Sequence, residues 1–110
     1  MPFDQYVVVL TTVPADVDAE QIATRMVDER LAACVNILPV MRSIYRWKQQ
    51  VDQDDERQLI IKTTHERIRE LEALIRKLHP AEIPEFVVIP ISTGSADYLA
   101  WMAESTTTDG

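Results

Sequence analysis

This sequence of 110 residues has little of what several common functional sites require. Its two glycines, Gly94 and Gly110, exclude a glycine-rich phosphate-binding loop. Its single cysteine, Cys34, excludes an internal disulfide and a CxxC metal or redox motif. No apolar run approaches the roughly 20 residues of a membrane-spanning helix, and Asp4 stands where a secretory signal needs a basic segment. These absences favour a cytoplasmic protein with no membrane partner.

A shortage of basic residues narrows the choice of partners further. Eleven lysines and arginines stand against eighteen acidic residues, which gives a net charge of −7. Binding of nucleic acid needs a concentrated basic face, so we expect no nucleic-acid partner. Length and a hydrophobic fraction of 46% predict one domain over residues 1–110, with residues 104–110 as a flexible tail.

The apolar segments predict an α+β fold. Four extended stretches rich in β-branched or apolar residues are expected at residues 5–13, 34–47, 59–64 and 86–91. The polar segment 49–58 is expected to carry the chain reversal between the second and the third of them.

Helices are predicted between these stretches. Apparent capping boxes at Asp18 and Thr63 open two segments with apolar residues at helical spacing, the first ending near residue 31 and the second before Pro80. A short third helix follows Gly94. The resulting order, β-α-β-β-α-β plus a terminal helix, predicts a ferredoxin-like sandwich with two helices on one face of an antiparallel sheet. Its other apolar face lacks cover and predicts self-association.

The stretch HPAEIPE, residues 79–85, is the densest cluster of candidate ligands. His79 and Glu82 could bind a divalent metal such as Cu²⁺ or Zn²⁺. A tight site needs three or four convergent ligands, and a histidine at a helix C-terminus before a proline also has a structural explanation. That helix-end interpretation is favoured for the motif taken alone.

Other polar residues allow a functional and a structural interpretation in the same way. Lys62 lies in an apolar strand, where its charge needs a partner such as Glu85 or Glu82. Cys34 is interpreted as a packing residue, because no neighbouring base is indicated. The acidic run at residues 52–56 lacks the glycine of a calcium-binding loop and is interpreted as a charged hairpin reversal. Weak surface binding of transition-metal or alkaline-earth ions by this run remains an open alternative. We expect no catalytic activity, since no nucleophile and base can be paired.

Five motifs together make the chain similar to the CutA family of divalent-cation-tolerance proteins. They occur in the family's order and spacing between Tyr6 and Trp101: ERLAACVNILP (29–39), SIYRW (43–47), LIIKT (59–63), HPAEIPE (79–85) and YLAW (98–101). Three positions depart from the family pattern. Ala81 replaces a usual tyrosine, Gln49 a common glycine, and Thr11 a cysteine found in some bacterial members.

The resemblance implies a homotrimer similar to PII signalling proteins, with the sheets facing one another. It implies copper or other divalent cations as ligands, with His79 and Glu82 as candidate metal residues and no required cofactor. A cleft between protomers would gather four further candidate residues for a small ligand, Lys62, Glu85, Tyr98 and Trp101. Two alternatives remain open: a PII-like sensor that binds a small anionic metabolite in these clefts, and a trimeric scaffold for another protein.

Overall fold

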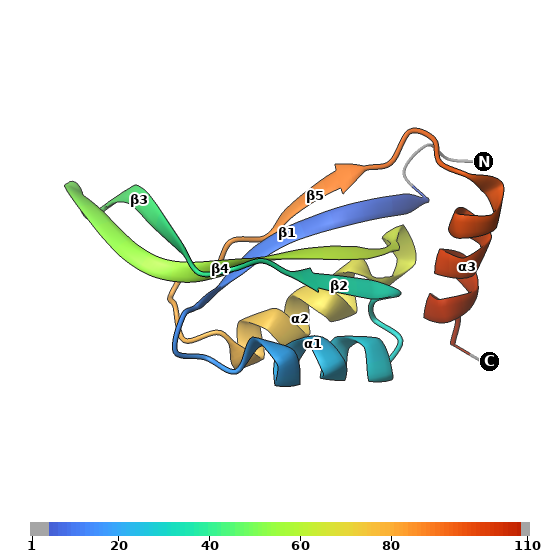
Figure 1. The fold of residues 1–110 in the computed structure, drawn as a ribbon, viewed down its shortest axis with the longest axis horizontal. Coiled ribbons are helices and arrows are strands. Elements are labelled where there is room, and N and C mark those ends of the chain that lie inside the picture. The colour runs from blue at the N-terminus through green and yellow to red at the C-terminus, as the bar shows by residue number, and fades with distance from the viewer. Residues whose placement is uncertain (1–4, 109–110) are drawn as a thin grey trace.

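The structure, a computed structural model, describes residues 5–108. Strands and helices alternate along the chain in the order shown in Figure 1. In sequence they are β1 (Tyr6–Pro14), α1 (Ala19–Asp28), β2 (Cys34–Ile37), β3 (Met41–Trp47), β4 (Gln50–Thr64), the 3-10 turn η1 (His65–Arg67), α2 (Ile68–Leu78), β5 (Val87–Pro90) and α3 (Ala96–Thr106).

The strands form one antiparallel sheet in the order β2-β4-β1-β5. α1 and α2 lie on one face of this sheet, and α3 lies at the end where β1 begins and β4 ends (Figure 1). This arrangement confirms the predicted α+β ferredoxin-like fold. The predicted second stretch, residues 34–47, is divided into β2 and β3 near Pro39, and β3 pairs with the first half of β4.

Alternation along the central strands builds the core. Val7 and Val9 on β1 and Leu59 and Ile61 on β4 are fully buried, because side chains two apart point to the same face. The helices cover them with apolar stripes that include the fully buried Met26 and Leu71.

The ends of α1 are fixed by specific backbone contacts. The predicted cap at Asp18 is confirmed, since the Gln21 N–H donates to Asp18 Oδ1 at 3.1 Å. The helix ends at Asp28, earlier than predicted, because Arg30 adopts a left-handed conformation with φ of 61°. The Arg30 side chain donates to the carbonyl oxygens of Glu104 and Ser105 in α3, at 3.5 and 3.3 Å.

The predicted capping box at Thr63 is wrong. The Thr63 side chain is fully buried, and its hydroxyl donates to the Leu31 carbonyl at 2.7 Å instead of capping a helix. Strand β4 runs on to Thr64, and η1 separates it from α2. The hydroxyl therefore joins β4 to the chain that follows α1.

The predicted hairpin between the second and third extended stretches is confirmed, but its reversal is much shorter than residues 49–58. Residues 50–58 belong to β4, and the chain turns at Lys48 and Gln49, which have φ of 47° and 70°. Two consecutive left-handed residues are typical of the tight hairpin turn in which Asn-Gly is preferred. The resulting hairpin of β3 with the first half of β4, the arm, projects beyond the helices (Figure 1).

The C-terminal helix is longer than the sequence suggested. Glu104 and Ser105 lie in α3 and Thr106 is buried, so the predicted flexible tail does not begin at residue 104. The Thr106 hydroxyl donates to the Met102 carbonyl at 2.9 Å and lies 3.3 Å from the Thr64 hydroxyl. Residues 109 and 110 of that predicted tail lie outside the described part of the chain.

The face of the sheet opposite α1 and α2 is apolar and partly exposed, as predicted. Val8, Leu10 and Ile60 are half-buried on it, and Val87 and Ile89 of β5 are 48% and 43% exposed. Strands β2 and β5 are the edge strands of the sheet, so the backbone groups on their outer sides have no strand partner within the sheet. We call the apolar face opposite α1 and α2 the outer face. Self-association through it stays a prediction.

The turn of the arm provides a first test. Replacing Gln49 with glycine should raise the free energy of unfolding by about 0.5–1 kcal/mol, because glycine tolerates a φ of 70° without a steric penalty. Gln50→Gly is the matched control: Gln50 lies in β4, where glycine should lower stability. Urea denaturation of both variants measures the difference, and equal losses in the two would contradict a left-handed turn at Gln49.

Candidate functional site

His79 follows α2 and uses both of its ring nitrogens within the chain. Its Nε2 lies 2.8 Å from the Thr12 carbonyl oxygen, and its Nδ1 accepts from the Ala81 N–H at 3.0 Å. Since a carbonyl oxygen can only accept, Nε2 carries the hydrogen and the ring is in its neutral Nε2–H form. Neither nitrogen offers a free lone pair to a metal in this arrangement. The bonds instead fix the start of the 79–85 loop against β1.

Glu85 ends the same loop and is held by two polar side chains. Gln58 Nε2 donates to Glu85 Oε2 at 2.7 Å, and the Thr11 hydroxyl donates to the Glu85 carbonyl at 2.6 Å. Lys62 lies four positions beyond Gln58 on β4 and opposite Val8 of β1. The suggested pairing of Lys62 with Glu85 is therefore wrong within one chain.

Three of the four residues proposed for the cleft do come together, at α3. The Lys62 ammonium lies 5.8 Å from the centroid of the Tyr98 ring. The Tyr98 and Trp101 rings lie 5.3 Å apart at an angle of 44°, and both residues are partly exposed. No carboxylate in residues 5–108 forms an ion pair with Lys62. Glu85 lies apart from this group in the single chain.

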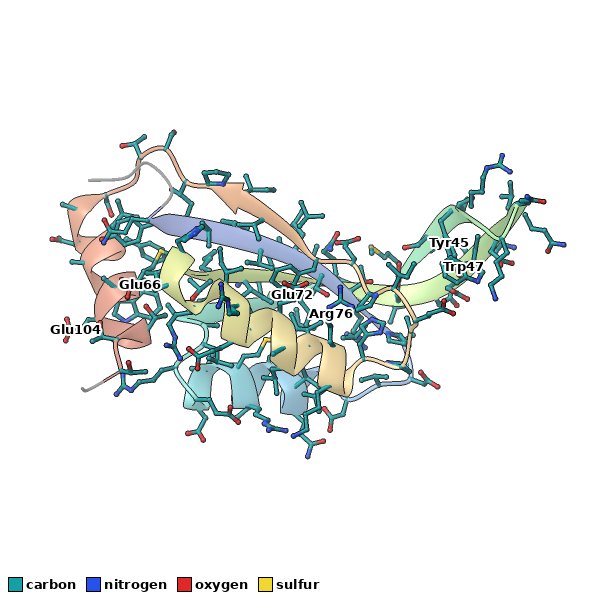
Figure 2. All side chains as sticks on the ribbon, turned by 180° about the vertical axis from the view of Figure 1, so that it is seen from behind. Tyr45, Trp47, Glu66, Glu72, Arg76 and Glu104 are labelled. Atoms are coloured by element: carbon teal, nitrogen blue, oxygen red, sulfur yellow. The ribbon has the colours of Figure 1, made fainter. Side chains whose placement is uncertain are left out.

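A groove of about 760 Å³ separates the arm from the 79–85 loop; we call it the arm–loop groove. Three candidates from the sequence line it, namely His79, Glu82 and Glu85. The arm contributes two residues of the acidic run, Asp54 and Glu56, and four residues that the sequence did not single out as ligands, namely Ser43, Ile44, Tyr45 and Trp47. The residues from β3 fell in a stretch predicted as extended, whereas Asp54 and Glu56 fell in the segment assigned to the reversal. Figure 2 shows Tyr45 and Trp47 on the arm, far from Glu66 and Glu104 at the other end of the molecule.

Tyr45 and Asp54 form a polar pair across the two strands of the arm. The Tyr45 hydroxyl donates to the Asp54 carboxylate in a short hydrogen bond. This bond, together with the negative charges of Asp54, Asp52 and Glu56, raises the pKa of Tyr45 to about 12. The phenol is consequently neutral at physiological pH and acts as a donor to Asp54.

The remaining carboxylates of the groove do not form a metal centre by themselves. Within residues 5–108, no three His, Cys, Asp or Glu side chains are grouped so as to hold a metal ion. The carboxylates of Glu56 and Glu82 have no hydrogen bond or ion pair with the rest of the described chain. None of the helices in that part of the chain is long and apolar enough to span a membrane.

Comparison with known proteins identifies close relatives over nearly the whole chain. The divalent-cation tolerance protein CutA of Thermus thermophilus is 48% identical over 99 residues, covering 90% of this chain and 96% of that protein. The protein of the same name from Pectobacterium atrosepticum is 38% identical over 104 residues, covering 94% of each.

Solved structures agree with this result. The divalent cation tolerance protein Cut A1 of Thermus thermophilus superimposes with a TM-score of 0.89 at 46% identity, covering 93% of this chain and 99% of that one. CutA1 of a psychrotrophic Shewanella species gives 0.91 at 34% identity, covering 97% and 100%. A protein of Archaeoglobus fulgidus, described as the periplasmic divalent cation tolerance protein CutA, gives 0.87 at 30% identity, covering 93% and 99%.

A family model described as CutA1 divalent ion tolerance protein matches residues 7–105. Since that match spans almost all of the sheet and the helices, the chain belongs to the CutA1 family of divalent ion tolerance proteins.

Proposed function

We propose that this protein acts in the response to divalent metal ions, and that it binds copper or other divalent cations weakly as a cytoplasmic homotrimer. The observation that carries the proposal is the lining of the arm–loop groove, where Glu82 and Glu56 have no partner within the described chain. The names of its relatives point the same way, since they are called divalent-cation tolerance proteins. The proposal includes no catalytic reaction.

Glu82 is the proposed ligand in the groove, because its carboxylate is exposed and has no partner in residues 5–108. His79 can join it only if Nδ1 releases the Ala81 N–H, which has a cost in hydrogen bonding. A single chain, as far as it is described, thus falls short of the three ligands that a tight site requires. Weak binding, or binding completed by a second protomer, follows from this shortage.

The outer face supports the trimer. Its apolar side chains would otherwise stay in water, and burying them is favourable in proportion to the area removed from solvent. The free edges at β2 and β5 offer backbone groups that a second sheet can pair with. Closed assembly protects both features from open-ended aggregation.

Calorimetric titration with Cu²⁺ and with Zn²⁺ tests the metal site. Glu82→Gln should weaken binding by about threefold or more, since one charge-assisted ligand is lost. Glu66→Gln, a matched charge change at the far end of the molecule, should leave the affinity unchanged (Figure 2). Equal affinity in the Glu82 and Glu66 variants would contradict a site at Glu82.

The variant His79→Ala, studied in the same titration, tests whether His79 is a metal ligand or a residue that anchors the 79–85 loop. We expect unchanged metal affinity but a free energy of unfolding lower by about 1–3 kcal/mol, because the Thr12 carbonyl and the Ala81 N–H lose their partner. A large loss of metal affinity without loss of stability would instead make His79 a ligand.

Light scattering tests the trimer. The unmodified protein should give three times the mass of one 12.6 kDa chain. Ile89→Asp, which places a charge on the outer face, should shift the population towards smaller species. Ile83→Asp, at a more exposed position outside the strands, is the control and should leave the mass unchanged. A monomeric unmodified protein would rule out the trimer.

One observation favours the second candidate function, a sensor for a small anionic metabolite. The Lys62 ammonium lies near the Tyr98 ring and has no hydrogen bond or ion pair among the described residues, so its charge is available to an anion. A Lys62→Gln variant should lose binding of such an anion while the oligomer stays intact. A thermal-shift screen of carboxylate and phosphate metabolites, with this variant as the reference, tests for such binding. If no metabolite raises the melting temperature in a Lys62-dependent way, the sensor function is rejected.

A further inference from the structure

We draw no further inference here: the strongest candidate, the cluster of Lys62, Tyr98 and Trp101 where α3 meets the sheet, belongs to the anion site already proposed, and nothing in the described part of the chain shows whether a second copy covers it.

Discussion

The pairing of β1 with β4 is the constraint on which the rest of the molecule depends. The two strands pair antiparallel along the whole of β1, from Tyr6 opposite Thr64 to Pro14 opposite Glu56. A slip of one residue would turn every side chain to the other face of the sheet, so burial of the core residues under α1 and α2 fixes the register. The same register sets Gln58 beside Thr12, within reach of Glu85, and places Lys62 near α3. Both candidate ligand regions are consequences of this one ladder.

Much of the fold could be predicted because its local and tertiary preferences agree. The β-branched run of β1, the cap at Asp18 and the apolar stripe of α2 each point to the element that forms. The arm could not be predicted in the same way. Residues 50–55 of β4 are exposed on both faces and show no apolar alternation, and the turn uses Lys48 and Gln49 in place of the usual Asn and Gly.

The candidate site was predictable only in part, for reasons of geometry. The sequence singled out the 79–85 loop because a histidine and two carboxylates are adjacent there. It could not show that His79 bonds to Thr12, which is 67 positions away, or that Glu85 reaches Gln58 and not Lys62. Thr63 shows the same limit, since its hydroxyl serves a buried tertiary contact that outweighs its local preference for a helix cap. The hairpin that carries the arm was predicted, but the sequence placed its reversal at residues 49–58, so the groove residues Asp54 and Glu56 were not expected on a strand.

Arg30 has a consequence for the order in which the molecule assembles. Its backbone terminates α1 and its side chain reaches Ser105, which lies 75 positions further along the chain. Closing so long a loop has a large entropic cost until the sheet has brought both ends together. The contact therefore forms late, after α3 has been synthesised. It joins the C-terminal end of α1 to α3. An opening of α3 in the folded protein would free the Arg30 side chain, while the backbone hydrogen bonds that end α1, such as Leu31 N–H to the Met26 carbonyl, stay in place.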